Sequence, residues 1–202
     1  NWEMALLTGR AQYSDLLEWQ LYNAACVGMS LSGDRYFYNN PLVSRGNITR
    51  LPWYAVPCCP SNLSRTWASL GKHLYSRDGH DLWIHQYVGS RADLGDGLRI
   101  EVESGVPWDG DVRIRFEGRA PIRAAIHFRI PSWADLFTIH LNGEPVVADT
   151  PAKPISPSTA CGYAPNKSHF VRNDRVWNPG DELALHFSLP IRLVRQDSRL
   201  PL

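Results

Sequence analysis

The sequence has 202 residues, of which 44% are hydrophobic and 20% are charged, and its formal net charge is +1. This length allows one large or two small domains, and the balanced charge excludes the strongly basic surface typical of nucleic-acid partners. No apolar run is long enough to span a bilayer, so we expect no membrane partner either. Eight Trp and eight Tyr suit a carbohydrate-handling protein, but they suit a packed β-sandwich core even better.

The first part of the chain has mainly helical periodicity. The opening stretch NWEMALLTG looks like the inside of a helix and does not begin with Met, so we expect a fragment of a longer protein. It shows no signal-peptide pattern. Residues 14–29 place apolar side chains at helical spacing, with Ser14 as the expected N-cap. Residues 32–42 predict a turn, a short extended piece and another turn. Residues 60–75 predict a second helix that begins at Pro60 or Ser61.

From about residue 81 the hydrophobic period becomes two, which predicts strands. Alternating segments span residues 81–90, 98–105, 111–118, 123–131, 137–144 and 181–194. Short strands at this spacing favour an antiparallel β-sandwich. Residues 150–168 are rich in Pro and Ser and predict a long loop. We therefore divide the chain into a helical segment, 1–78, and a sandwich domain, 79–202, in the α+β class.

Two of the four cysteines, Cys58 and Cys59, stand side by side between prolines, just before the second predicted helix. Three interpretations compete. The pair could hold a metal, although two to four residues usually separate zinc cysteines in the sequence. One thiol could be a nucleophile, because a helix N-terminus favours the thiolate. The pair could also be buried and inert, whereas a strained vicinal disulfide is disfavoured.

The remaining cysteines and the strand histidines are weaker candidates. Cys26 lies in an apolar helical run, which indicates packing, and Cys161 lies in the predicted loop, where we expect a surface thiol. The strand histidines alternate with apolar residues and lack a second ligand at close spacing, so we expect outward or interfacial positions. These histidines are His85, His127, His140 and His186.

An ordered series of motifs resembles glycoside hydrolase family 127, the β-L-arabinofuranosidase type, and the related family 146. The most specific motif is the CCP-x-N-x-x-R element that begins at Cys58. The series runs along almost the whole chain as YSDLLEWQLYN (13–23), GMSLSGDRYFYNNPL (28–42), PCCPSNLSRTWASLGKHLY (57–75), DLWIHQYVGS (81–90), PWDGDVRIRF (107–116), FRIPSW (128–133), NGEPV (142–146), RVWNPGDELALHF (175–187) and PIRLV (190–194).

The resemblance implies an (α/α)₆ barrel followed by β-sandwich domains, and a retaining exo-glycosidase that removes β-L-arabinofuranosyl units from an arabinose-containing glycan. It implies that Cys58 is a thiolate nucleophile bound to Zn²⁺ and that Cys59 is a second zinc ligand. It also implies that Glu18 is a catalytic active-site residue and that Tyr38 lines the sugar pocket. Taken without the resemblance, Glu18 would be a solvated helix residue.

The sequence departs from the family pattern in two respects. The family completes its zinc site with a Glu-x-Cys element and takes its acid/base glutamate from upstream, and no Glu-x-Cys occurs in these 202 residues. Asn39 replaces an apolar residue of the motif beside Tyr38. We therefore expect a C-terminal portion of such an enzyme that is inactive alone. Its expected partner is the missing N-terminal barrel portion or a second copy in a homodimer.

A different class of function stays open alongside the enzyme. The sandwich could be a non-catalytic carbohydrate-binding or accessory module with structural cysteines, since a fold does not fix a function. The location favoured by the sequence is cytoplasmic, because reduced thiolates are easier to maintain there.

Overall fold

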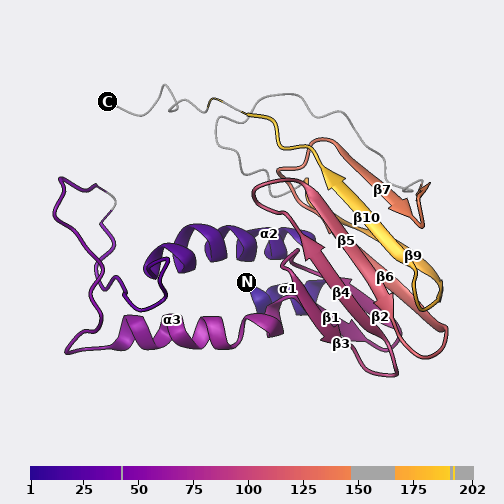
Figure 1. The fold of residues 1–202 in the computed structure, drawn as a ribbon, viewed down its shortest axis with the longest axis horizontal. Helices are drawn as coiled ribbons and strands as arrows, with labels where there is room; N and C mark the ends of the chain where they lie inside the picture. Colours follow the sequence, from indigo (N-terminus) through magenta and orange to yellow (C-terminus); the bar gives the residue numbers. More distant parts are fainter. Residues whose placement is uncertain (42, 147–166, 192, 194–202) are drawn as a thin grey trace.

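The computed structural model describes all residues except 42, 147–166, 192 and 194–202. It consists of two packed β-sheets and a helical part that extends away from one end of them (Figure 1). The helices α2 and α3 run from the sheets towards the same side of the molecule, and the described residues between them lie at their far ends. Among the described residues, no helix has the length and apolarity needed to cross a membrane.

The first predicted helix is present but begins earlier than expected. After α1 (Trp2–Thr8), α2 spans Ala11–Gln20 and continues as a π-helix, η1 (Leu21–Ala25), and a 3₁₀ turn, η2 (Cys26–Gly28). Ser14 is therefore not the N-cap. Ser14 is an interior residue of α2, and its hydroxyl forms a hydrogen bond with the ring of His85, 2.8 Å away. The hydroxyl that the sequence suggested as a cap therefore makes a tertiary contact.

The second predicted helix, α3, spans Cys58–Ala68 and is followed by the 3₁₀ turn η3 (Leu70–His73). It begins two residues before Pro60. Proline is tolerated in the first turn of a helix because the N–H groups there have no intrahelical acceptor. Cys58 and Cys59 are consequently the first two residues of the helix, with Pro57 at the N-cap.

The sandwich has a four-stranded and a six-stranded sheet. The first has the order β1-β2-β6-β9 and the second the order β3-β4-β5-β10-β7-β8. The strands are β1 (Tyr75–Asp78), β2 (Asp81–Ile84), β3 (Ser90–Asp93), β4 (Arg99–Ser104), β5 (Asp111–Glu117), β6 (Ile122–Ile130), β7 (Phe137–Leu141), β8 (Glu144–Pro145), β9 (His169–Trp177) and β10 (Glu182–Phe187).

The sandwich prediction is confirmed, but one strand pair differs from it. β2 and β6 are parallel, with Asp81 opposite Ala125 and Ile84 opposite Phe128. Between them, β3, β4 and β5 belong to the other sheet. The chain therefore crosses back to the first sheet, and β6 runs beside β2 in the same direction. The alternation missed β1, β3 and β9, of which β1 and β3 are only four residues long.

The inward faces of the two sheets form the main core. β5 shows why its residues form a strand of this sandwich: Val112, Ile114 and Phe116 are buried, and the residues between them are polar. Phe116 stacks on Trp177 of β9 with ring centroids 4.1 Å apart, which joins the two sheets. Several aromatic residues thus serve packing, as the composition suggested.

A second packed region joins α2 to the sandwich, and His85 lies at its centre. The ring of His85 bonds Ser14 through Nδ1 (2.8 Å) and Ser76 through Nε2 (2.7 Å), and Trp2 packs edge-on against it. Gln86 donates to the backbone oxygen of Ser14 at 2.7 Å. His85 is therefore an interfacial residue that holds helix and sheet together.

We expect acid to weaken this interface. Burial, together with repulsion from Arg129, lowers the pKa of His85 from 6.5 to about 4. The unfolded chain therefore binds a proton that the folded chain rejects as the pH falls from 6.5 to 4. The contribution is intact above pH 6.5, and about 3 kcal/mol is lost by pH 4. Free energies of unfolding at pH 7 and pH 4.5 measure it.

The matched variants are His85→Gln and His186→Gln. His85→Gln removes the buried imidazole and should flatten the pH dependence in this range. His186→Gln removes an exposed strand imidazole that pairs with Asp111. If both variants keep the wild-type pH dependence, His85 does not cause it.

Candidate active site

The two adjacent cysteines lie at the exposed N-terminus of α3. Cys58 is exposed and Cys59 is partly buried, and both are free thiols. Their Sγ atoms are 3.8 Å apart, so they face the same side although they are neighbours in the chain. No side chain caps the helix, and Ser61 donates its backbone N–H to the carbonyl oxygen of Pro57. The two cysteines therefore lie in the first turn, at the positive end of the helix dipole.

Tyr38 lies beside this pair although it is twenty residues away in the sequence. Cys58 Sγ donates a hydrogen bond to the Oη of Tyr38, and the two atoms are 3.8 Å apart. Its ring packs against Tyr54, with centroids 5.5 Å apart, and the hydroxyl of Tyr54 donates to the backbone oxygen of Tyr36. Backbone bonds between Tyr36 and Leu51 tie the segment of Tyr38 to the segment that precedes the cysteines.

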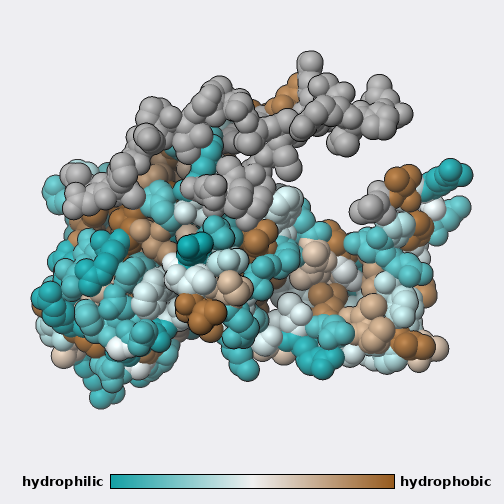
Figure 2. Space-filling model, turned by 180° about the vertical axis from the view of Figure 1, so that it is seen from behind, coloured by the Kyte–Doolittle hydropathy of each residue, from teal (hydrophilic) through white to brown (hydrophobic). Residues whose placement is uncertain are grey.

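Exposed aromatic and apolar side chains also occur in the segment that precedes the cysteine pair. Trp53 packs edge-on against Tyr36 and is half-exposed, and Val56 is exposed two residues before Cys58. Figure 2 shows apolar side chains interspersed with polar ones on the surface of the helical part. Exposed aromatic rings of this kind offer apolar faces on which the C–H groups of a sugar can pack.

The neighbours of the two thiols separate their acidities. The hydrogen bond with Tyr38, followed by that with Cys59, lowers the pKa of Cys58. Desolvation, followed by the interaction with Cys58, raises the pKa of Cys59. The hydrogen bond with Cys58 also raises the pKa of Tyr38, so the phenol keeps its proton and donates a hydrogen bond to the sulfur once Cys58 is a thiolate. Cys58 is thus the thiol of the pair that ionises first, as a nucleophile requires.

We expect Tyr38→Phe to raise the pKa of Cys58, because the phenol no longer stabilises the thiolate. At a fixed pH below that pKa, a smaller fraction is thiolate and alkylation is slower. The rate of iodoacetamide labelling of Cys58 as a function of pH, followed by peptide mass spectrometry, measures the shift. Tyr54→Phe is the matched control, since it removes a hydroxyl that bonds backbone. An unchanged labelling midpoint in Tyr38→Phe would contradict the role of the phenol.

The geometry of the two sulfurs fits a zinc site. Two thiolates that bind one tetrahedral zinc at 2.3 Å lie about 3.8 Å apart, and the Sγ atoms of Cys58 and Cys59 are separated by 3.8 Å. They would occupy two of four positions. Within the part of the chain that the structure describes, no group of three or more His, Cys, Asp or Glu side chains is close enough to hold a metal.

Glu18 occupies a different environment from the cysteines. It is buried on α2, where one carboxylate oxygen pairs with Arg129 of β6 and the other accepts a hydrogen bond from Trp133 Nε1 at 2.5 Å. It is therefore not the solvated residue that its helical position alone suggests. The structure brings Tyr38, Cys58 and Cys59 together and gives Glu18 partners from the sandwich. The assignment of Glu18 to the active site remains a prediction.

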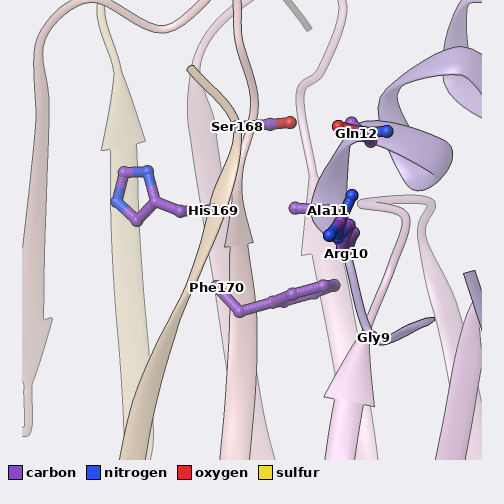
Figure 3. A pocket seen from close by; sticks show the side chains of 7 residues that line it. All are labelled: Gly9, Arg10, Ala11, Gln12, Ser168, His169 and Phe170. Carbon is purple, nitrogen blue, oxygen red and sulfur yellow. The ribbon is translucent and has the colours of Figure 1, made fainter. Parts of the chain in front are cut away.

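Other residues considered in the sequence lie elsewhere. Cys26 is partly buried, and burial raises the pKa of its thiol, while Cys161 lies outside the described residues. A groove of about 520 Å³ lies between the α1–α2 turn and the start of β9 and contains none of the predicted site residues. Figure 3 shows the hydroxyl of Ser168 directed towards the side of Gln12, with the ring of His169 pointing away.

Sequence reasoning missed three contributors. Tyr54 supports Tyr38, and Asp15 and Arg129 form the buried ion pairs around Glu18. Only Arg129 left a local signal: it is a charge within the apolar run of residues 124–130, where an arginine is buried only when it is paired.

Comparison with known proteins agrees with this arrangement on both halves of the chain. Residues 1–72 match the model of the GH127 β-L-arabinofuranosidase catalytic domain, and residues 81–189, more than half of the chain, match that of the GH127 middle domain. The chain belongs to glycoside hydrolase family 127. This confirms the family that the motif series indicated.

Individual GH127 proteins resemble the chain over nearly its whole length. A non-reducing end β-L-arabinofuranosidase of Bifidobacterium longum is 30% identical over 98% of the chain. The structure of a GH127 β-arabinofuranosidase aligns with a TM-score of 0.79 at 30% identity over 93% of the chain. That of a GH127 β-L-arabinofuranosidase from Geobacillus stearothermophilus T6 aligns with a TM-score of 0.76 at 30% identity over 96%.

The chain spans only a part of these relatives. It covers 30% of the Bifidobacterium enzyme, and 30% and 31% of the two solved GH127 structures. What those complete proteins do therefore comes to this chain only as a proposal.

Proposed function

We propose that this chain supplies the nucleophile of a retaining exo-β-L-arabinofuranosidase, and that Cys58 is that nucleophile. The observation that carries the proposal is the position of the exposed Cys58 thiol at the N-terminus of α3, within hydrogen-bond reach of Tyr38 and Cys59. Family membership supports it, since the Bifidobacterium relative is a non-reducing end β-L-arabinofuranosidase.

The proposed reaction has two steps at Cys58. Its thiolate attacks the anomeric carbon of a terminal arabinofuranosyl unit, a C–S bond forms, and the glycosidic C–O bond breaks. The leaving oxygen takes a proton from an acid. Water then attacks the same carbon and gives a proton to the conjugate base of that acid, the C–S bond breaks, and the thiolate is regenerated. Two displacements at one carbon retain the anomeric configuration, as in the carboxylate-based retaining enzymes.

Cys58 and Cys59 are the residues that would hold a zinc ion. Bound there, zinc would keep a coordinated thiol deprotonated near neutral pH. The family pattern takes its other two ligands from a Glu-x-Cys element and its acid from another glutamate, and these 202 residues contain no Glu-x-Cys. We propose that the chain works as one portion of the enzyme, with these groups supplied by another portion.

Tyr38 would act as donor and as part of the sugar pocket. Its hydroxyl stabilises the thiolate before attack, and its half-exposed ring offers a face to the sugar. The proposed substrate is a glycan with terminal β-L-arabinofuranosyl units.

Cobalt(II) titration tests the metal half of the proposal, because cobalt substitutes for zinc and its thiolate bonds absorb near-ultraviolet light. In a polypeptide that also supplies the other two ligands, we expect about one cobalt for each Cys58–Cys59 pair, with thiolate absorption. Cys58→Ser and Cys59→Ser should each lose that absorption, and Cys26→Ser should keep it. Unchanged absorption in the first two variants, or none in the natural polypeptide that contains this chain, would contradict a zinc–cysteine site.

A further inference from the structure

The cysteine site forms where two helical arms meet, and the arms are attached to the sandwich in different ways. α3 is joined to it by the chain itself, since it leads through η3 directly into β1. α2 runs out in the same direction (Figure 1), but it is preceded by α1 and has no covalent link of its own to a strand. The position of α2 relative to α3 therefore depends on side-chain contacts.

Arg129 of β6 makes the central contact with α2. Its side chain is fully buried, and Nη1 pairs with Asp15 while Nη2 pairs with Glu18, one helical turn apart on α2. Its Nε donates to the backbone oxygen of His85 at 2.6 Å, and its own backbone oxygen accepts from Tyr87 at 2.5 Å. Contacts within the sandwich thus hold Arg129 in place, and its two terminal nitrogens remain to bind the helix.

The residues that follow Arg129 complete the attachment. The backbone N–H of Ser132 donates to Asp15 Oδ2 at 3.0 Å, and Trp133 Nε1 donates to Glu18 Oε1 at 2.5 Å. Residues 129–133 therefore bond all four carboxylate oxygens of Asp15 and Glu18. Charge-assisted bonds of this kind, buried and in a fork, fix orientation strongly.

The far end of the same helix carries Tyr38. α2 continues without a break through η1 and η2 to Gly28. The backbone oxygen of Gly28 accepts a hydrogen bond from the backbone N–H of Phe37 at 2.9 Å, and Phe37 directly precedes Tyr38. Arg50 donates to the oxygen of Val27 at 2.7 Å. Gly28 also lies against α3, because a Cβ added there would come within 3.1 Å of Leu63. A tilt of α2 would move this end against α3.

We propose that Arg129 is a positioning residue for the cysteine site: by holding Asp15 and Glu18 it sets α2 on the sandwich and so places Tyr38 beside Cys58. Both oxygens of Glu18 accept bonds from sandwich donors, so its carboxylate takes part in this attachment. The role of Arg129 in turnover rests on the proposed function, whereas its placement of residues 28–38 does not.

Hydrogen–deuterium exchange of the whole chain, read by mass spectrometry, tests the placement. In Arg129→Met we expect the amides of residues 28–38 to exchange at least about tenfold faster, as local opening becomes easier. Arg129→Lys, which keeps one charged donor, should restore part of the protection. Amides of β4 and β5 should stay protected. Arg115→Met is the matched control, because Arg115 pairs with Glu103 and Glu182 on the outer sandwich surface.

Trp133→Phe keeps the test decisive if Arg129→Met does not fold. It removes the indole N–H that binds Glu18 and keeps an aromatic ring against Phe187. It should speed exchange in residues 28–38 in the same direction, by a smaller factor. Wild-type exchange of these residues in both Trp133→Phe and Arg129→Lys would overturn the proposal, as would wild-type exchange in a folded Arg129→Met.

An activity assay separates this proposal from the proposed function. If the natural polypeptide hydrolyses β-L-arabinofuranosides, the variants with faster exchange in residues 28–38 should have the lower kcat. Arg129→Lys should recover part of the kcat that Arg129→Met loses. KM should change less than kcat. Full activity of Cys58→Ser would refute the nucleophile without touching the exchange result. Faster exchange in residues 28–38 with an unchanged kcat would refute the positioning role alone.

Discussion

Cys58→Ser should lower the turnover of a β-L-arabinofuranoside by at least about 10³-fold in the natural polypeptide that contains this chain, the scale on which loss of a nucleophile acts. A serine hydroxyl ionises far less readily than a thiol, and Tyr38 would then bond a neutral oxygen. Cys58 is exposed at a helix start, so the substitution should leave the fold intact. Release of 4-nitrophenol from the 4-nitrophenyl glycoside measures the rate.

Two further serine variants show whether the effect belongs to this sulfur. Cys26→Ser changes the same atom in a partly buried thiol of η2 and should keep near-wild-type turnover. Cys59→Ser should lower turnover by weakening the metal site while leaving Cys58 available to alkylation. Near-full activity of Cys58→Ser would refute the mechanism.

Arg129→Met should destabilise the protein by about 3–5 kcal/mol, the usual cost of removing one partner from a buried ion pair. Methionine fills a similar volume, so the loss comes chiefly from leaving Asp15 and Glu18 buried without a counter-charge. Both carboxylates are less than a tenth exposed, and little water can replace the guanidinium. Urea unfolding at pH 7 measures the difference in free energy.

A double-mutant cycle separates charge from packing. Glu18→Gln combined with Arg129→Met should cost less than the sum of the two single variants, because the single arginine variant strands a charge that glutamine does not carry. Arg115→Met, on the exposed network with Glu103 and Glu182, should change stability much less. Strict additivity in the cycle would show that Arg129 stabilises through packing.

The sequence predicted those features that local patterns specify. The two-residue period of 111–118 and 123–131 predicted β5 and β6 to within one residue at each end, because alternate burial is a property of the strand itself. Helical spacing in residues 60–75 predicted α3, with the adjacent thiols just before its start, and the structure begins the helix at Cys58. The family followed from motif order, which needs no knowledge of contacts, and the comparisons confirmed it.

Strand neighbours were decided only by the tertiary structure. Alternation tells which face of a strand is buried but not which strand lies beside it, so the parallel pairing of β2 with β6 was not predictable. β1 and β3 are too short to show a period. Their pairing partners, and not their own sequence, make them strands.

The candidate site divides in the same way. The sequence by itself determined that two thiols stand together at a helix N-terminus, because that depends on adjacent residues and the capping region alone. Only the tertiary structure decided that Tyr38 lies beside Cys58 and that Arg129 meets Asp15 and Glu18 more than a hundred residues away. The physical reason is that a buried charge needs a counter-charge, and packing, not sequence spacing, selects which one it finds.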